Sequence, residues 1–227
     1  FFKIMAKTNF KTLRKNMVDG QIHPSGVVDD DILNAYETIP RELFVPEDLK
    51  GISYTDEGIS ISHGRFLMEP ITHSRIIQAA RPTPHDVVLD VATGSGYTAA
   101  ILSPMVSTII ALESDEDLLK RAEQFWKKTK SCNIVSACND IEQGCPEHAP
   151  YSLILLNGAS ANVPAALLDQ LAPGGRLIAT LQKQGETIGQ VTVFNKSEDG
   201  HISDYSLFNA GIAYLPEFAP KPEFVFS

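Results

Sequence analysis

One stretch of the sequence, VLDVATGSGYTAA at 88–100, limits the possible folds more than any other. An apolar run, Val87–Val91, stops at a turn of small residues, Ala92–Gly96, and a helix-compatible stretch follows. Gly94 and Gly96 have no Cβ and can adopt positive φ, so a ligand can approach the backbone of such a strand–turn–helix. The spacing lacks the third glycine of the dinucleotide fingerprint and supports a nicotinamide site only weakly. The turn therefore indicates either a ligand site or a plain connection.

Two acidic residues near this turn support a ligand site. Asp90 lies in the first apolar run, and Glu113 ends the next one, 23 residues further along the chain. An acidic residue in that place can accept hydrogen bonds from ribose hydroxyls. Glu113 could also open a helix, because the acidic segment 114–117 follows it and negative charge is favourable in a first turn. The two roles are compatible, and we expect Glu113 to bind ribose.

Composition argues against several classes of protein. A net charge of −9 and a pI near 5.1 do not suit a nucleic-acid surface, which needs clustered lysines and arginines. The three cysteines form neither a C-x-x-C pair nor a His-partnered set, so we expect no metal site, no disulfide framework and a reducing cytoplasm. We also expect no membrane span, which needs ~20 consecutive apolar residues, and no secretion signal.

The hydrophobic pattern predicts helices first and then alternating strands and helices. Helices are expected at 9–22, from Asp29 to Pro40, and at 71–80, 97–103, 115–129 and 163–171. Strands are expected at 87–91, 106–112, 133–138, 151–157, 176–181, 187–195 and 203–213. Segment 46–64 is rich in Gly, Ser, Asp and Pro and is expected to be a loop.

Several of these strands are unbroken apolar runs, such as 153–156. Such runs are typical of a parallel sheet that is covered on both faces. The last two strands follow one another without a helix and predict an antiparallel hairpin. We therefore expect an α/β, Rossmann-like fold in a single domain, 1–227, with a helical cap and loop at 1–80 and a cofactor-binding sheet at 81–227.

Short motifs along nearly the whole chain match one enzyme family. They are Asn16–Ile22, Val28–Asp29, Pro40–Pro46, Tyr54–Glu57, Thr93–Tyr97, Ala149–Tyr151, Val163–Pro164, Gln170–Gly175, Tyr214–Pro216 and Phe224–Phe226. On these residues the chain resembles the protein-L-isoaspartate O-methyltransferases, which are class I S-adenosylmethionine-dependent methyltransferases. It looks like a divergent, bacterial-type branch of that family.

The resemblance implies a seven-stranded, mostly parallel sheet whose last strand is antiparallel. It implies S-adenosylmethionine as cofactor, S-adenosylhomocysteine as product, and methyl transfer to the α-carboxylate of L-isoaspartyl residues in damaged proteins, which is a repair reaction. We expect a cytoplasmic monomer with protein or peptide substrates and no nucleic-acid or membrane partner. The implied cofactor contacts are Leu67, Met68, His73, Asp90, Ala92, Thr93, Gly94, Ser95, Gly96, Glu113, Ser114, Asn139, Asp140 and Asn157.

The chain departs from the family at the signature loop, Gly64–Pro70, which reads GRFLMEP. The family usually carries Gly-Gln-Thr-Ile-Ser-Gln/Ala-Pro there, so its hydroxyl residues fall on Phe66 and Met68. The serine usually assigned to the active site is absent, and no catalytic residue is assigned. Two alternatives to isoaspartyl methylation follow: another acceptor on the same fold, or cofactor binding without turnover.

Methyl transfer from a sulfonium to a carboxylate needs no general base, because carboxylates titrate near ~4 and are ionised at neutral pH. Positioning and desolvation of the carboxylate would supply the catalysis. The candidate substrate anchors are Arg65, Glu69 and Asn157. Arg65 could pair bidentately with a carboxylate, or it could form a surface salt bridge with Glu69, four residues further on.

Several other residues have two interpretations each. His73 could contact the cofactor or be structural. Phe66 and Met68 could line an apolar pocket or only pack in the core. Asp140 could accept from the adenine amino group or cap a turn, and Asn157 could face the substrate or belong to a turn.

Overall fold

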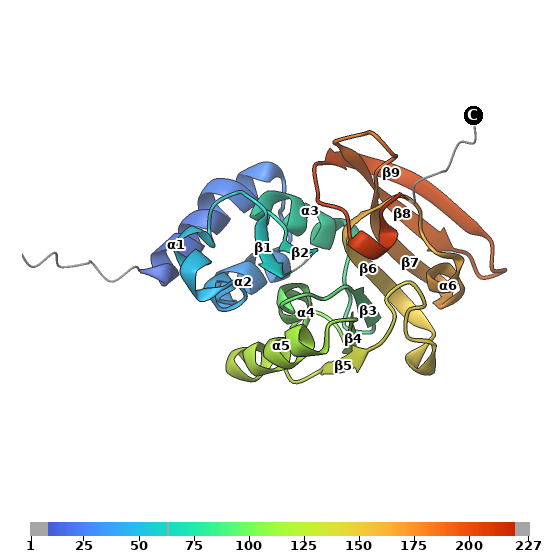
Figure 1. Ribbon diagram of the computed structural model, residues 1–227, viewed down its shortest axis with the longest axis horizontal. Coiled ribbons are helices and arrows are strands. Elements are labelled where there is room, and N and C mark those ends of the chain that lie inside the picture. Colours follow the sequence, from blue (N-terminus) through green and yellow to red (C-terminus); the bar gives the residue numbers. More distant parts are fainter. Residues whose placement is uncertain (1–8, 63, 221–227) are drawn as a thin grey trace, which may run out of the picture.

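The computed structural model describes residues 9–62 and 64–220, and the motif at 224–226 lies outside them. Its helices and helical turns are α1 (Phe10–Met17), η1 (Val18–Ile22), η2 (His23–Ser25), α2 (Asp30–Thr38), η3 (Arg41–Leu43), η4 (Glu47–Ile52), α3 (Pro70–Ala80), α4 (Tyr97–Leu102), α5 (Glu116–Thr129), η5 (Pro146–His148), α6 (Ala165–Asp169) and η6 (Pro216–Phe218). Its strands are β1 (Ile59–Ser62), β2 (Arg65–Leu67), β3 (Val87–Val91), β4 (Thr108–Glu113), β5 (Ile134–Cys138), β6 (Tyr151–Ser160), β7 (Leu171–Leu181), β8 (Gly189–Lys196) and β9 (Ile202–Ala210). Figure 1 shows the N-terminal helices and the β1–β2 hairpin on one side of the molecule and the β8–β9 hairpin on the other.

Strands β3 to β9 form one seven-stranded sheet in the order β5-β4-β3-β6-β7-β8-β9. The pairs from β5 to β7 are parallel, whereas β7–β8 and β8–β9 are antiparallel. This confirms the α/β, Rossmann-like fold and the terminal hairpin. One detail is wrong: the strand that opposes the others is β8, not the last one. The chain reverses direction between β7 and β8 and again between β8 and β9, so β9 runs in the same direction as the parallel strands.

Both faces of the sheet are covered, as the unbroken apolar strands predict. On one face Val88, Ile109 and Leu153 share a core with residues of helices α1 to α5. On the other face Leu89 and Ile110 share a second core with residues of α6 and η6. Neighbouring residues of one strand thus enter different cores, because side chains alternate across a sheet. The sheet is the middle layer of the molecule.

The helices begin where the sequence provides caps. The Asp29 carboxylate accepts the Asp31 N–H (3.0 Å) and the Ile32 N–H (3.1 Å) at the start of α2. Asp115 accepts the Leu118 N–H (2.9 Å) at the start of α5. These caps confirm the starts of both helices within one residue. In the described parts of the chain, no helix is both long enough and apolar enough to cross a membrane.

The expectation of a loop at 46–64 is wrong, because this segment contains η4 and β1. β1 pairs antiparallel with β2, with Ile59 opposite Leu67 and Ser60 opposite Phe66. The two isoleucines of β1 are buried and alternate with serines, so this short segment has a strand pattern that needs a partner. The partner comes from the signature loop. The resulting hairpin packs against the edge of the main sheet that carries the turn Ala92–Gly96, called the glycine turn below.

Candidate active site

The glycine turn lies at the carboxyl end of β3, where ligand crevices form in open α/β sheets. Gly94 and Gly96 have φ of 58° and 82°. A Cβ on Gly94 would lie 2.9 Å from Ile61 Cδ1, and a Cβ on Gly96 would lie 2.5 Å from the indole nitrogen of Trp126. Only glycine fits these positions without strain. Other side chains therefore pack close to the backbone of the turn, and one of them is Ile61 of the β1–β2 hairpin.

Glu113 is fully buried at the end of β4, and its carboxylate contacts the turn. The Gly94 N–H donates to Oε2 (3.0 Å), and the Ser114 N–H donates to Oε1 (2.8 Å). The structure therefore brings the residue expected to bind ribose beside the glycine turn. Helix α5 has Asp115 as its N-cap, so Glu113 does not cap that helix.

A chain of hydrogen bonds beneath the turn links β3 to β6. Asp90 is fully buried, and its two oxygens accept from Thr93 Oγ1 (2.5 Å) and Asn157 Nδ2 (2.6 Å). Asn157 Nδ2 also donates to the Val91 carbonyl (3.0 Å), and Asn157 Oδ1 accepts from Thr98 Oγ1 (2.7 Å). Asn157 lies within β6, so the turn interpretation of this residue is wrong. Its role toward a substrate stays a prediction.

The same chain continues through His73 to α2. Thr98 donates its proton to Asn157, so it must accept from His73 Nε2 (2.9 Å), and Tyr36 then donates to His73 Nδ1 (2.5 Å). Burial, with a smaller effect of the Arg41 guanidinium, lowers the pKa of His73 to about 3. His73 is therefore a neutral imidazole held at both nitrogens. This position is structural, and its contact with a cofactor stays a prediction.

Asp90 titrates in the opposite sense. Burial raises the pKa of Asp90 to about 6, although the hydrogen bonds from Thr93 and Asn157 oppose that shift. A carboxylate with this pKa is mainly ionised at neutral pH and becomes neutral in mild acid. Asp90 therefore holds the turn through Thr93 as an acceptor at neutral pH.

Arg65, the first residue of β2, points into the site and not toward solvent. Its side chain is 6% exposed, and Nη2 lies 2.8 Å from a Glu113 oxygen and 2.8 Å from a Glu217 oxygen. The alternative of a surface salt bridge with Glu69 is wrong. Both residues are described, no ion pair joins them, and an extended strand carries Glu69 away from Arg65. Because two carboxylates fill the guanidinium fork, Arg65 presents no free fork to a substrate in this structure.

Charge holds this cluster together. Burial acts to lower the pKa of Arg65, but hydrogen bonds to Glu217 and Glu113 outweigh it and raise that pKa well above its ordinary value. Burial acts to raise the pKa of the Glu217 carboxyl, but the Arg65 guanidinium outweighs it and lowers that pKa. Arg65 and Glu217 are therefore both charged at neutral pH.

The remaining side chains of the signature loop are mostly apolar. Leu67 and Met68 are buried, whereas Phe66 is 39% exposed. The Met68 carbonyl accepts a hydrogen bond from Arg41 Nη2 (2.5 Å). Glu69 is the N-cap residue of α3, and its side chain makes no capping hydrogen bond there. The core interpretation of Met68 agrees with its burial, and the loop has no hydroxyl in place of the family's serine.

The residues expected near adenine follow β5. The Asp140 carboxylate accepts the Glu142 N–H (2.9 Å), and Asn139 Oδ1 accepts the Asp140 N–H (2.9 Å). These are the local bonds of a turn, as one interpretation of Asp140 predicts. The adenine contact of both residues stays a prediction. Ser114 lies closer to the ion pairs, since its hydroxyl accepts from Arg65 Nη2 (3.1 Å).

Ser95 provides a test of whether these residues fit a bound cofactor. It is buried, and its Oγ has no hydrogen-bond partner among the described residues. Buried polar groups almost always have a partner, so this hydroxyl suits a ligand group. The cavity between Ser95, His73 and Met68, however, measures about 10 Å³, whereas ligand pockets measure roughly 300–1,000 Å³. The side chains fit a cofactor, but the site has a closed shape.

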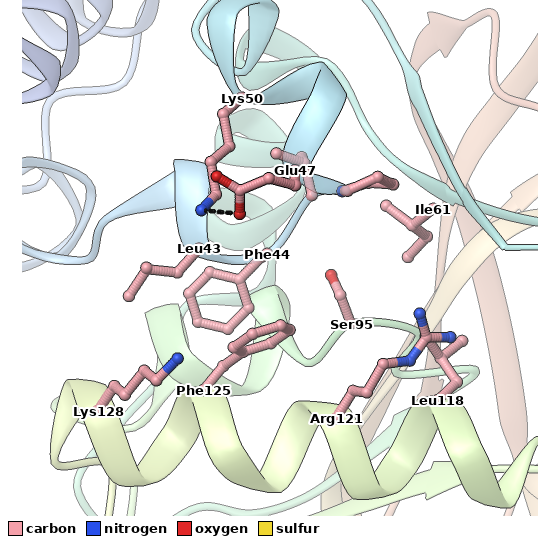
Figure 2. Close-up of a pocket in the computed structure, with 12 residues that line it drawn as sticks. Leu43, Phe44, Glu47, Lys50, Ile61, Ser95, Leu118, Arg121, Phe125 and Lys128 are labelled. Carbon is pink, nitrogen blue, oxygen red and sulfur yellow. Dashed lines mark hydrogen bonds and ion pairs between the residues drawn. The ribbon is translucent and has the colours of Figure 1, made fainter. Parts of the chain in front are cut away.

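A larger cavity of about 260 Å³ lies beyond Ser95 and Ile61. Figure 2 shows it between η3–η4 and α5, with the aromatic rings of Phe44 and Phe125 beside it and the Ser95 hydroxyl pointing into it. Lys50 pairs with Glu47 at its edge (2.5 Å). Among its described lining residues, Ser95 is the one that was expected to contact the cofactor. This cavity therefore adjoins the expected cofactor site at Ser95.

Three members of the site were not predicted from the sequence. Tyr36 and Thr98 complete the chain of hydrogen bonds through His73, and Glu217 holds Arg65. Thr98 had one usable signal, because it is a polar residue within an otherwise apolar helix next to the glycine turn. Tyr36 and Glu217 had none, since their partners are 37 and 152 residues away in the sequence.

Comparison with known proteins agrees with this geometry. A family model described as protein-L-isoaspartate(D-aspartate) O-methyltransferase matches residues 12–217. A protein-L-isoaspartate O-methyltransferase from Synechococcus sp. is 39% identical over 173 residues, which are 76% of this chain and 71% of that protein. The enzyme of the same name from Gloeobacter violaceus is 33% identical over 207 residues, 91% of this chain and 99% of that protein.

Solved structures show the same fold. One protein-L-isoaspartate O-methyltransferase structure has a TM-score of 0.75 and 21% identity, and the match covers 88% of this chain and 65% of the other. A beta-aspartate methyltransferase from Plasmodium falciparum, in complex with S-adenosyl-L-homocysteine, has a TM-score of 0.71 and 23% identity, with 93% and 100% coverage. At these identities the two structures support the fold.

Proposed function

The chain belongs to the protein-L-isoaspartate(D-aspartate) O-methyltransferase family, and from this membership we propose that it methylates the α-carboxylate of L-isoaspartyl residues in damaged proteins. S-adenosylmethionine is the proposed methyl donor. The observation that carries the proposal is the 3.0 Å hydrogen bond from Gly94 to Glu113, which joins the glycine turn to the ribose acceptor. The related Plasmodium falciparum protein, solved with S-adenosyl-L-homocysteine, supports the choice of cofactor.

Three groups of residues would hold the cofactor. Glu113 would accept from the ribose hydroxyls, the turn at 93–96 with the Ser95 hydroxyl would hold the amino-acid end, and Asn139 and Asp140 would contact the adenine. When bound, S-adenosylmethionine supplies a methyl group on a sulfonium. The rest of the chemistry depends on how the protein places the acceptor.

The acceptor carboxylate is already ionised at neutral pH, so no side chain has to remove a proton from it. This agrees with the site, because His73 is a neutral imidazole with both nitrogens engaged. The protein's contribution is to position the carboxylate and to exclude water. The buried side chains of Leu67 and Met68 suit the exclusion of water.

We also propose that the cap and the sheet act together as one domain and that the protein works as a cytoplasmic monomer on protein or peptide substrates. The core of the cap is continuous with that of the sheet, since Ile32 and Ile77 share one cluster with Val88. The three cysteines are free, which suits a reducing compartment.

A methyltransferase of this fold with another acceptor is the second candidate. The signature loop favours it, because Phe66 and Met68 replace the two hydroxyl residues and the fork of Arg65 is filled by Glu113 and Glu217. Both changes affect how an acceptor carboxylate would be held, whereas the glycine turn is unchanged.

One assay separates the two candidates. The protein is incubated with tritiated S-adenosylmethionine and an isoaspartyl peptide, beside the same peptide with a normal aspartyl residue. Methyl transfer to the isoaspartyl peptide alone is the expected result. Cofactor binding by calorimetry without transfer to either peptide would reject isoaspartyl methylation and leave the second candidate.

A further inference from the structure

Arg65 closes the part of the site where the ribose would bind. Its Nε donates to both oxygens of Glu113 (3.1 and 3.0 Å), and its Nη2 donates to Oε1 (2.8 Å). Its other N–H groups reach both oxygens of Glu217 (2.8 and 3.0 Å) and the Gly64 carbonyl. A guanidinium has five N–H donors, and those of Arg65 are directed at these partners and Ser114.

Glu113 has no acceptor capacity left for a ligand. A carboxylate offers about four lone-pair sites. Besides Arg65, its oxygens accept from the Gly94 N–H (3.0 Å), the Ser114 N–H (2.8 Å) and the Asp115 N–H (3.3 Å). The backbone donors are fixed by the glycine turn and the start of α5. A ribose hydroxyl can therefore bond to Glu113 only after Arg65 has left.

Glu217 gives Arg65 a place to go. Its side chain is 29% exposed, whereas Glu113 is fully buried, so the outer carboxylate lies toward solvent. The two elements involved already touch, because a Cβ on Gly64, at the start of the signature loop, would lie 2.2 Å from Pro216 of η6. Arg65 can thus release Glu113 and keep an ion pair with Glu217. The guanidinium of Arg65 therefore has a carboxylate partner in either position.

We infer that Arg65 is the residue that sets how tightly this chain binds its cofactor: it occupies the ribose acceptor, and binding requires its transfer to Glu217. The inference rests on the proposed use of S-adenosylmethionine. It also explains the volume of about 10 Å³ beside Ser95, since the hairpin that carries Arg65 and Ile61 lies over the glycine turn. The apparent affinity of such a site falls by the fraction of molecules in which it is open.

The test is calorimetric binding of S-adenosylhomocysteine to the full chain and to three variants. Arg65→Gln shortens the side chain and removes its charge, so it should bind about tenfold more tightly, as for a site closed in about nine molecules of ten. Arg65→Lys keeps the charge without the fork and should lie between that variant and the parent. Lys127→Gln, an exposed change on α5 with the same loss of charge, should bind like the parent.

A second measurement does not depend on how stable the variants are. The Nε–H signal of Arg65 in the parent protein's NMR spectrum should shift when S-adenosylhomocysteine is added, because that N–H loses Glu113. Equal or weaker binding by Arg65→Gln, or an unmoved Nε–H signal on a protein that binds the ligand, would overturn the inference. If neither the parent nor Arg65→Gln binds at millimolar ligand, the proposed cofactor itself is wrong.

Discussion

Asp90 and His73 belong to one chain of hydrogen bonds, yet their titrations change the stability of the fold in opposite directions. Asp90 has its pKa raised to about 6 from an ordinary value of 3.8, so its contribution to stability is present at low pH and is lost as pH rises through 6. His73 has its pKa lowered to about 3 from 6.5, so its contribution is present at neutral pH and is lost as pH falls below 6.5.

The two effects oppose each other in the intact chain. Between about pH 7.5 and about pH 5, protonation of Asp90 should add about 1 kcal/mol to the free energy of unfolding. Over the same range, His73 should lower the free energy of unfolding by about 2 kcal/mol, because it gains a proton in the unfolded chain but stays neutral in the folded one. The parent should therefore change by no more than about 1 kcal/mol, which is close to the precision of a denaturation experiment.

Asp90→Asn should reveal the effect of His73 on stability alone. Whatever its absolute stability, this variant should lose about 2 kcal/mol between about pH 7.5 and about pH 5, since His73 then acts alone. His73→Gln, the matched control, should gain about 1 kcal/mol over that range. Urea unfolding can be followed by the fluorescence of Trp126, the single tryptophan, which is buried. Identical pH dependence in the parent and Asp90→Asn would refute the reasoning.

Three further changes test the site and its support. Glu113→Ala should weaken S-adenosylhomocysteine binding by about 1–3 kcal/mol in calorimetry, the scale of lost hydrogen bonds to a charged group; unchanged affinity would remove Glu113 from the ribose role. Gly96→Ala should cost about 2–4 kcal/mol in thermal unfolding, because its Cβ would meet the indole of Trp126 at 2.5 Å, whereas Gly185→Ala, with similar φ and open space, should cost only about 1–2 kcal/mol. Arg176→Met should cost about 3 kcal/mol by urea unfolding, because it leaves the buried carboxylate of Asp86, 2.8 Å from the guanidinium, without its partner. A loss under about 1 kcal/mol would mean that water replaces the guanidinium there.

The strand–turn–helix could be predicted because all of its signals are local. The run Val87–Val91 matches β3 without error, and α4 begins directly after Gly96. The β1–β2 hairpin could not be predicted in the same way. Ile59 and Ile61 alternate with serines over only four residues, within a stretch whose composition is that of a loop. That strand exists because β2 pairs with it, and pairing is not a local property.

The same contrast between local and distant signals applies to the residues of the site. Spacing alone placed Glu113 beside the glycine turn, because the carboxyl ends of adjacent parallel strands meet at one edge of a sheet. Spacing could not pair Arg65 with Glu113, which is 48 residues away, when Glu69 offered an opposite charge nearby. Nor could it show that Asn157 donates to Asp90 across 67 residues. Polar contacts between distant segments follow from the assembled fold.

Arg41 has a consequence for how the signature loop can be altered. This fully buried arginine holds the loop by the carbonyl of Met68 (2.5 Å) and holds the end of η4 by the carbonyl of Ser53 (2.6 Å). Carbonyl oxygens are present whatever the side chain is, so the anchor does not depend on the sequence of the loop. Side chains in the segment from 65 to 69, such as Phe66, can therefore be exchanged for those of a relative without changing the backbone conformation of the loop.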